Sequence, residues 1–210
     1  MLVIQGHQIH LRDWRVEDLP LYARWQSPEH LWQQLDGPYY AKLDAEGITK
    51  QVEEMRPVIE KADWPNPRRR LVIAERTNDQ LIGTVSWYWI GKETNWLAQG
   101  IVIFDDTTWR RGIGYEALGL WSQYLFDTLP QIVRLDLRTW SGNWGMQALA
   151  RKLGYLEEAR FRKARIVDGV YYDGLGFGIL REEWQARYPG GFAEHLLHDA
   201  EGGNDATSSF

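Results

Sequence analysis

The sequence predicts a single α+β domain in which an antiparallel meander of strands precedes a strand–helix–strand connection. β-branched and aromatic residues form three runs, at 69–76, 80–90 and 95–104, that are joined by turn residues, as in a meander. An amphipathic segment of helical length at 112–126 then leads to another apolar run at 132–140. Because a helix between two strands lets them lie parallel, we expect one parallel pair in an otherwise antiparallel sheet.

The segment before the meander predicts a strand, two helices and a long loop. Residues Ile9–Trp14 alternate like an edge strand, and 16–26 carry acidic residues in the first turn and an apolar face, as amphipathic helices do. Pro, Gly and aromatic residues fill Ser27–Asp44 without a period, which indicates a loop long enough to act as a lid. A helical pattern resumes over Glu46–Ala62.

After the crossover, the sequence predicts a helix, a hairpin and a short helical end. The helix covers Asn143–Leu153 and stops at Gly154, since glycine commonly ends helices. Two strands follow at 158–167 and 170–180, and the Asp168-Gly169 pair between them is typical of a hairpin turn. One or two short helices complete the predicted order of elements.

Length and composition indicate one domain. A chain of 210 residues buries roughly 70% of its unfolded surface when it folds as one unit. We expect residues 1–198 to form this unit and residues 199–210 to be a disordered tail. The sequence contains no cysteine, which excludes disulfides, thiolate zinc sites, iron–sulfur clusters and a cysteine nucleophile.

The charge pattern favours a small anionic ligand over a nucleic acid. The net charge of −5 lacks the cationic surplus that phosphate neutralisation needs, yet arginines cluster at 68–70, 110–111 and 160–165. No apolar run approaches the roughly 18 residues of a membrane span, and the first residues lack a secretory pattern. We therefore expect a cytoplasmic protein that binds neither nucleic acid nor membrane.

The glycine motif Gly112-Ile-Gly114-Tyr-Glu-Ala117 admits two interpretations. It satisfies the dinucleotide fingerprint G-x-G-x-x-G/A, but the first glycine of that fingerprint directly follows its strand, whereas Asp105–Arg111 intervene here. A nicotinamide enzyme is therefore the weaker interpretation. The stronger one is a phosphate site, because amides at a helix start bind phosphate oxygens and Arg110 and Arg111 add positive charge.

The motif and its flanks resemble the acetyl-CoA loop of the GNAT acetyltransferase superfamily, in particular its RimJ/RimL branch. Four further blocks lie in the order found in that branch. These are the opening Ile9–Leu19, Asn143 with the helix after it, the Lys152-Leu153-Gly154-Tyr155 block, and Tyr172-Asp173 followed by a strand and Glu183-Trp184. The resemblance covers about residues 7 to 185.

The resemblance implies a twisted mixed sheet with helices on both faces, in which the strand ending near Phe104 and the strand 132–140 splay into a slot for acetyl-CoA. A bulge in the earlier strand is expected to expose its backbone to the pantetheine amides, and the glycine turn to hold the diphosphate. The implied cofactor-binding residues are Ile103, Phe104, Trp109, Arg110, Arg111, Gly112, Ile113, Gly114, Tyr115 and Asn143. A plain helix N-cap is the alternative role of Asn143.

The activity implied by the resemblance is transfer of an acetyl group from the CoA thioester directly to a primary amine, with an amide near Ile103 or Phe104 as the oxyanion donor. The acid and base of the family do not carry over: Met146 and Arg165 occupy the positions of the RimL-like Ser and Glu, and Ala150 and Gln99 those of other superfamily groups.

The candidates for catalysis are accordingly Asn143, Glu93 and Asp173, with Asp36 or ordered water as other bases. A surface or turn role is the alternative for each of these carboxylates. A non-catalytic acyl-CoA sensor is the alternative function.

The loop before residue 45 is where the branch covers the acceptor. Aromatic and acidic residues there suit a cationic amine, whereas Arg165 and Arg162 suit an acceptor with a carboxylate. The substrate-binding candidates are Trp32, Asp36, Tyr39, Tyr40 and Arg165, and packing of a helix on the sheet is the alternative for the aromatics. The acceptors left open are a protein α-amine, an aminoglycoside, a polyamine and an amino-acid-like amine.

Two further expectations concern metal and self-association. His195 and His198 lie three apart in a helical tail without a third ligand nearby, so we expect a solvated helix face and no metal. Members of the branch often pair through exposed aromatic strands, so a homodimer is a further hypothesis.

Overall fold

The computed structural model describes residues 1–205 and shows one mixed sheet with the strand order β1-β2-β3-β4-β5-β6-β8-β7. Every neighbouring pair is antiparallel except β5 and β6, which are parallel. The strands are β1 Val3–Gln5, β2 Ile9–Arg12, β3 Arg70–Glu75, β4 Leu81–Gly91, β5 Trp96–Ile103, β6 Arg134–Trp140, β7 Leu156–Val167 and β8 Val170–Leu180. The predicted α+β class, with a meander and one parallel pair, is confirmed.

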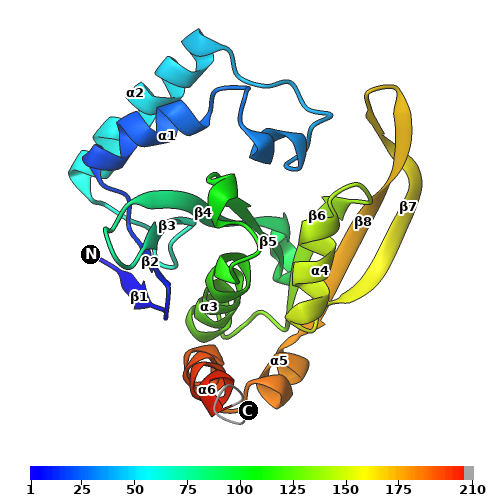
Figure 1. The fold of residues 1–210 in the computed structure, drawn as a ribbon. Coiled ribbons are helices and arrows are strands. Elements are labelled where there is room, and N and C mark those ends of the chain that lie inside the picture. The colour runs from blue at the N-terminus through cyan, green and yellow to red at the C-terminus, as the bar shows by residue number, and fades with distance from the viewer. Residues whose placement is uncertain (206–210) are drawn as a thin grey trace.

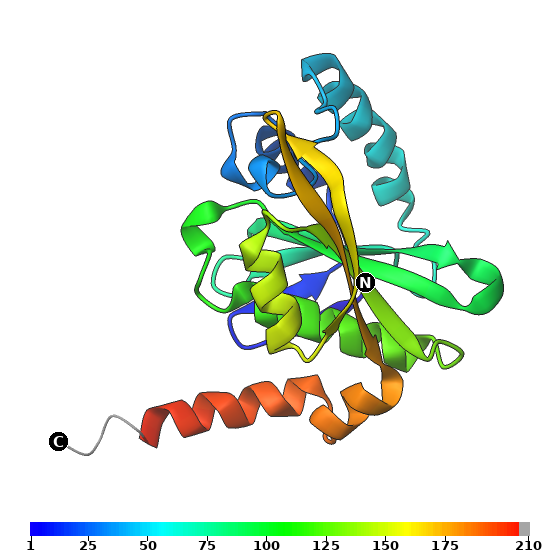
Figure 2. The same ribbon diagram turned by 90° about the vertical axis from the view of Figure 1, so that its right-hand side faces the viewer.

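Helices cover both faces of the sheet, as Figures 1 and 2 show. The helices are α1 Leu19–Trp25, α2 Ala45–Lys61, α3 Ile113–Thr128, α4 Trp144–Lys152, α5 Arg181–Arg187 and α6 Phe192–Asp205. Helices α1 and α2 lie on one face, and α3 packs on the other with α5 and α6 beneath it (Figure 1). The predicted helices on both faces are thus confirmed.

Two apolar cores result from the alternation of side chains along the strands. In β3, Leu71 and Ile73 face the core under α3, whereas Val72 and Ala74 face the core under α1 and α2. Successive residues of a strand point to opposite faces, so a continuous apolar run, as residues 71–74 of β3 form, must be covered on both sides. The sheet is therefore the middle layer of three.

Local signals explain most of the element boundaries. The Asp44 side chain accepts a hydrogen bond from the Gly47 amide at 2.8 Å and caps α2, as an aspartate at this position does. Asp168 and Gly169 have φ values of 49° and 77°, the left-handed pair that a tight hairpin requires. The predicted hairpin between β7 and β8 is confirmed.

Strand β1 and helix α6 lie at the two ends of the described chain. Strand β1 pairs with β2 but was not predicted, because three residues are too few to show alternation. Helix α6 continues to Asp205, so it extends into the segment 199–210 that we expected to be disordered. The rest of that segment, 206–210, lies outside the described residues.

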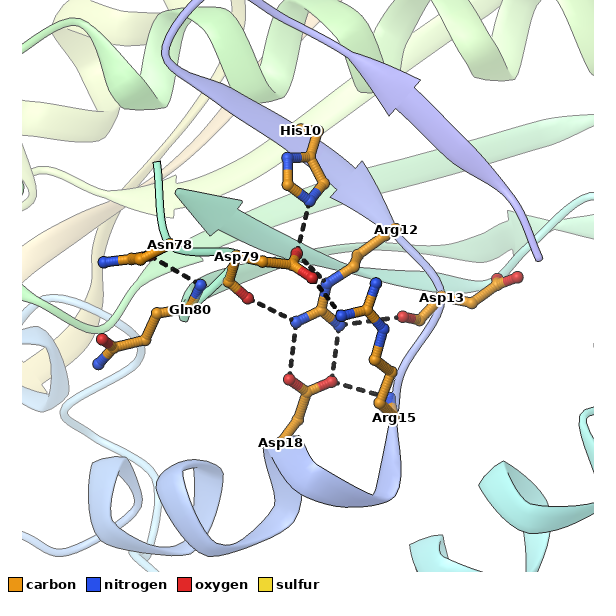
Figure 3. Close-up of polar contacts among 8 residues, drawn as sticks. All are labelled: His10, Arg12, Asp13, Arg15, Asp18, Asn78, Asp79 and Gln80. Carbon is orange, nitrogen blue, oxygen red and sulfur yellow. Dashed lines mark hydrogen bonds and ion pairs between the residues drawn. The ribbon is translucent and has the colours of Figure 1, made fainter. Parts of the chain in front are cut away.

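An ionic network joins β2 to the turn between β3 and β4 (Figure 3). Arg12 is 1% exposed and binds Asp18 with two hydrogen bonds, at 2.7 and 2.8 Å, while its Nε donates to Asp79 at 2.8 Å. His10 and Arg15 also contact Asp79. Burial by itself raises the pKa of Asp79, but the hydrogen bonds from Arg12, Arg15 and His10 outweigh it and lower the pKa to about 2. Asp79 is therefore ionised at neutral pH, and the network fixes the N-terminal part of the sheet.

Candidate functional site

The parallel strands β5 and β6 separate before they end. Their Cα partners run only from Leu97–Gln99 on β5 to Leu135–Leu137 on β6, although β5 continues to Ile103 and β6 to Trp140. Beyond Gln99 the two strands no longer pair, and each leaves main-chain groups that its neighbour does not satisfy. The slot that the resemblance implied is therefore present at the carboxyl ends of these strands.

The β5 wall of the slot consists of main-chain groups. The Phe104 amide donates to the Ile82 carbonyl of β4 at 2.8 Å, and amides of an antiparallel strand alternate in direction. The amides of Ile101 and Ile103 consequently face away from β4, toward the slot. The Ile103 carbonyl accepts a hydrogen bond from the Trp109 indole at 3.2 Å, so Trp109 closes the end of this wall.

Two expectations about this wall are corrected. Phe104 cannot offer its amide to a ligand, because β4 already uses it, and its ring is 2% exposed in the core with Trp32. The expected bulge is also wrong: β4 and β5 pair in register from Gly83–Ile103 to Trp89–Leu97, and their register shift lies at the opposite end of β5. The main chain of β5 is exposed only because β6 no longer pairs with it beyond Gln99.

The start of α3 has the geometry of an anion site. Gly112 is the N-cap with φ 86°, and no side chain caps the amides that follow. Arg110 has φ 64°, a left-handed conformation that costs a residue other than glycine about 1–2 kcal/mol, and strain of this kind clusters at functional turns. With exposed Arg110 and Arg111 beside the positive end of the helix, this turn can hold a diphosphate.

The side chains after Gly112 have structural roles. Ile113 is 3% exposed in the core, and a Cβ on Gly114 would lie 3.4 Å from Leu149 of α4, about van der Waals distance, so α3 and α4 pack together at this residue. The Tyr115 hydroxyl lies 2.9 Å from His195 Nε2, and the Lys152 ammonium lies 4.3 Å from the centre of the Tyr115 ring. Tyr115 therefore links α3 to α4 and α6.

A residue that the sequence reasoning missed, Glu116, fixes this turn to the sheet. Its carboxylate is 2% exposed and accepts the amides of Gln8 at 2.9 Å and Ile9 at 3.1 Å. The Gln8 side chain also donates to the Arg111 carbonyl at 3.2 Å. An acidic residue in a first helical turn is so common that no sequence signal separates this one from a surface glutamate.

The β6 wall is built from side chains that bind one main-chain carbonyl of the loop between α1 and α2. The Leu35 carbonyl accepts the Trp140 indole at 2.8 Å and the Asn143 side-chain amide at 3.1 Å. The Asn143 oxygen accepts the Met146 amide at 2.9 Å, so Asn143 also caps α4. The alternative role that we gave Asn143, a helix cap, is present, and its second role is to tether the loop.

Aromatic and cationic side chains from three distant segments meet beside this tether. Tyr39 contacts the Trp140 ring edge-on at 6.4 Å, and the Arg165 guanidinium lies 4.9 Å from the centre of the Tyr39 ring. Trp140 in turn contacts Tyr172 at 4.9 Å. Figures 1 and 2 both place the loop next to the tip of the β7–β8 hairpin. Tyr39 and Arg165 therefore do come together at the mouth of the slot.

The other acceptor-side candidates divide into core and surface. Trp32 is 8% exposed and donates to the Trp25 carbonyl at 2.7 Å, so it belongs to the core under α1, and its prediction as a substrate residue is corrected. Tyr40 is 66% exposed and packs on Tyr39 at 4.8 Å. Asp36 keeps an exposed surface, but the surrounding protein desolvates its carboxyl and raises its pKa, against the ammonium of Lys42, which lowers it.

The two other predicted bases lie at opposite ends of the region: Asp173 exchanges hydrogen bonds with Ser141 beside the end of β6, both at 2.9 Å, whereas Glu93 lies before the start of β5. Glu93 lies in the 3₁₀ turn Lys92–Thr94 before β5, and the eight residues of β5 extend about 26 Å from this turn to the end of the slot. Asp173 accepts the Lys163 amide and pairs with Arg160, both at 2.9 Å. The Lys163 hydrogen bond, then Arg160, lower the pKa of Asp173, which makes it a weaker base. Asp173 instead stabilises the irregular part of β7.

Beneath the slot, Gln99 belongs to a buried polar cluster. Its side-chain amide donates to the Ser122 hydroxyl at 2.7 Å and to the Tyr155 hydroxyl, which lies 2.9 Å from Ser122. Burial raises the pKa of Tyr155, and the hydrogen bonds from Ser122 and Gln99 that lower it do not compensate. Tyr155 therefore keeps its proton at neutral pH and joins α3 to β5.

No helix within residues 1–205 combines the length and the apolar character needed to cross a bilayer. His195 contacts Tyr115, and His198 lies 3.7 Å from Glu194. Among the described residues, no three His, Asp or Glu side chains are grouped as metal ligands.

Comparisons with known proteins agree with this geometry. A model of the acetyltransferase (GNAT) domain matches residues 8–156. The SPbeta prophage-derived uncharacterized N-acetyltransferase YokL of Bacillus subtilis (strain 168) is 22% identical over 175 residues, which cover 83% of this chain and 97% of that protein.

Solved structures share the fold. A GNAT-family acetyltransferase from Bacillus anthracis superposes with a TM-score of 0.68 at 15% identity, over 87% of this chain and all of that one. RimL, a ribosomal L7/L12 alpha-N-protein acetyltransferase in complex with coenzyme A, superposes with a TM-score of 0.64 at 18% identity, over 85% of this chain and 98% of that one. Because the domain model spans well over half of the sequence and includes the slot and the start of α3, the chain belongs to the GNAT acetyltransferase family.

Proposed function

We propose that this protein is an acetyl-CoA-dependent N-acetyltransferase of the RimJ/RimL type, which moves the acetyl group from the thioester directly to a primary amine. One observation carries the proposal: the unpaired ends of β5 and β6 lie beside the uncapped start of α3. Coenzyme A has an extended arm with two amides and a diphosphate. The slot offers main-chain partners to the amides of the arm, and the start of α3 offers backbone amides to the diphosphate.

Direct transfer suits the groups that line the slot. The reaction needs a neutral amine, a donor that faces the developing oxyanion, and a proton for the departing thiolate. We propose the Ile103 amide as the oxyanion donor, because the alternation along β5 turns it toward the slot while Phe104 faces β4. The absence of cysteine is consistent with a mechanism that forms no acyl-cysteine intermediate.

A non-catalytic acyl-CoA sensor is the second candidate function. Met146 and Ala150 stand where related sequences place acid–base side chains, and this favours a site that binds without turnover. The nicotinamide interpretation loses its support, because the sheet contains a single parallel pair and dinucleotide folds use a mostly parallel sheet.

Calorimetry and a thiol-release assay test these functions together. Coenzyme A, acetyl-CoA and NAD(P) would be titrated into the full chain, and release of thiol would be followed with peptide α-amines, an aminoglycoside, a polyamine and free amino acids. We expect coenzyme A to bind, NAD(P) not to bind, and at least one amine to be acetylated. Tight CoA binding without turnover supports the sensor, and no CoA binding contradicts both candidates.

A double variant, Arg110→Gln with Arg111→Gln, checks the diphosphate turn. Each lost charge–phosphate contact is worth roughly 1–3 kcal/mol, so coenzyme A should bind at least tenfold more weakly. Arg56→Gln with Lys61→Gln, which changes two exposed cations of α2, is a matched control that removes the same charge on the other face of the sheet. Equal loss in the control would mean that only the net charge matters.

We also propose that two copies of the chain associate. The β7–β8 hairpin supports this, because Leu156, Phe161, Ile166, Val170 and Tyr171 are all at least half exposed there, and clustered apolar surface is typical of interfaces. Sedimentation at micromolar concentration should give twice the monomer mass, and a monomer would contradict the proposal.

A further inference from the structure

We propose that the acceptor of this transferase carries both an amine and a carboxylate, and that Asp36 receives the amine and its proton while Arg165 binds the carboxylate. The inference rests on the proposed N-acetyltransferase function and deepens it. It names the substrate class. It also assigns a base, which was left open because Met146 and Arg165 occupy the positions where RimL-like members have Ser and Glu.

The position of Asp36 follows from the loop tether. Its neighbour, Leu35, is bound through its carbonyl by Trp140 at the end of β6 and by Asn143 at the start of α4. The Asp36 amide donates to the Trp32 carbonyl at 3.0 Å, and the Lys42 ammonium donates to the Asp36 carbonyl at 3.1 Å. The backbone of Asp36 is thus held from both sides, one residue away from the mouth of the slot.

The carboxylate of Asp36 is available to a ligand. Among the side chains of residues 1–198, none is hydrogen-bonded or ion-paired to its oxygens, while Lys42 acts on it only through charge. The side chain reaches solvent, and desolvation by the surrounding protein raises its pKa. A carboxylate of raised basicity is a better proton acceptor near neutral pH, and an incoming ammonium would supply its missing partner.

Arg165 is the complementary group. Its guanidinium stacks on Tyr39, one Nη donates to the Ala164 carbonyl at 2.9 Å, and its buried Nε has no hydrogen-bond partner in the described part of the chain. Arg160 on the same strand pairs with Glu157 and Asp173, whereas no described carboxylate pairs with Arg165. A partly buried guanidinium without an anion is suited to a carboxylate ligand, which it can bind through two parallel hydrogen bonds.

Tyr39 joins the two groups into one site. It lies three residues after Asp36, across a turn in which Gly37 has φ 56° and its carbonyl accepts the Tyr40 amide at 2.9 Å. Its ring contacts both Trp140 and Arg165. Arg165 on the Tyr39 ring and Asp36 three residues before Tyr39 therefore bring opposite charges to one loop beside the slot, an arrangement that matches a zwitterion and not a polyamine.

The chemical step is balanced with these residues. The ammonium of the acceptor gives one proton to the Asp36 carboxylate and becomes a neutral amine. The amine nitrogen then forms a bond to the thioester carbonyl carbon, the carbon–sulfur bond breaks, and the second proton leaves the nitrogen for the thiolate. Asp36 afterwards releases its proton to water, so that amide, thiol and one proton are the products.

Matched acceptors test the inference on the full chain. Thiol release would be measured with glycine, β-alanine and 4-aminobutyrate, with the corresponding primary amides, with dipeptides and their amides, and with spermidine. We expect kcat/KM to favour the carboxylates over their amides by roughly 10- to 100-fold. Arg165→Met should remove this preference mainly through KM, and Arg165→Lys should retain part of it.

The Asp36 variants separate chemistry from binding. Asp36→Asn should lower kcat by about 10²- to 10⁴-fold, Asp36→Glu should recover part of the loss, and coenzyme A should bind both as it binds the parent. Equal use of acids and amides, an unchanged preference in Arg165→Met, or an unchanged kcat in Asp36→Asn overturns the inference. If none of these probes reacts while another amine does, the inference fails and the transferase function stands, whereas failure with every amine contradicts both.

Discussion

The two walls of the slot are built from different parts of the polypeptide. On β5 the exposed groups are amides and carbonyls, and any residue with the same backbone can supply them. On the β6 side, Trp140 and Asn143 supply side chains that converge on the Leu35 carbonyl. We propose that the β5 wall binds the cofactor and the β6 wall faces the acceptor, and call them the cofactor wall and the acceptor wall. The comparison teaches that the cofactor wall tolerates substitution as long as the strand keeps its path, whereas the acceptor wall depends on individual side chains.

The largest effect is expected for Gly142→Ala in the acceptor wall. A Cβ at Gly142 would lie 1.9 Å from the Trp140 ring, which is 5% exposed and can move only by leaving the Leu35 carbonyl. Overpacking of this kind costs about 1–3 kcal/mol, measurable by urea unfolding. Gly145→Ala in α4, whose Cβ would meet only Asn143 at 3.8 Å, is the control and should be neutral or stabilising. Equal stability of both variants would contradict the close contact.

The ionic network of Figure 3 lies outside both walls, in the N-terminal part of the sheet, and gives the next largest effect. Asp79→Asn should lower the free energy of unfolding at pH 7 by about 1–2 kcal/mol, because Arg12 loses one partner but keeps Asp18 and Asp79 is about one-third exposed. Asparagine tolerates the left-handed conformation of this residue, φ 59°, so the backbone is not strained.

Acid should reduce the difference in the free energy of unfolding between Asp79→Asn and the parent. The pKa of Asp79 is about 2 in the folded chain, below its ordinary value of 3.8, so its contribution is complete above about pH 4 and is lost as the pH falls through 2. Urea unfolding at pH 7 and pH 3 measures it. A difference that grows in acid would contradict the assignment.

Two variants of Asn143 separate its two roles, the cap of α4 and the hydrogen bond that tethers the Leu35 carbonyl. Asn143→Ala removes both, and loss of the cap costs about 1 kcal/mol. Asn143→Asp retains an oxygen for the Met146 amide but loses the donor to Leu35. Hydrogen exchange should therefore rise in residues 31–40 in both variants, and at the start of α4 only in the alanine variant. Slow exchange of the loop in both would show that Trp140 alone holds it.

The smallest effect is expected for Glu93→Gln, outside both walls. Surface substitutions away from special features change stability within about 0.5 kcal/mol, and Glu93 lies in the turn before β5. Thiol release should be unchanged with any acceptor that the parent uses. A loss of kcat would support the predicted role of Glu93 as the catalytic base.

What the sequence could and could not predict follows the same division. The hairpin turn at Asp168-Gly169, the start of α3 at Gly112 and the cap at Asn143 are local, because each depends on the backbone preference of one or two residues. The order of elements was therefore predicted well. The splay of β5 and β6 came from the family resemblance alone, since no local pattern encodes where two strands stop pairing.

The acceptor wall was predicted less accurately for a physical reason. Trp32 and Tyr39 lie in the same aromatic loop, yet one is in the core and the other at the slot, and hydrophobicity does not distinguish these places. The Leu35 carbonyl has no signal in sequence at all, because every residue has a carbonyl. Asp173 was a candidate base because it is a carboxylate in a block that resembles the family, and its partners, Arg160 and the Lys163 amide, could not be foreseen because they are set by an irregularity of β7 that only the structure shows.

The main-chain wall of β5 has a consequence for divergence among relatives. Recognition through peptide groups places no demand of its own on the side chains of Ile101 or Ile103, which answer only to their packing against the core, so apolar substitutions can accumulate along this strand without altering the main-chain groups that it presents. Chains that share 15% to 22% of their residues with this one can therefore keep one architecture while their acceptor-facing side chains drift apart. Selection on such a strand acts on the path of its backbone and much less on the identity of its side chains.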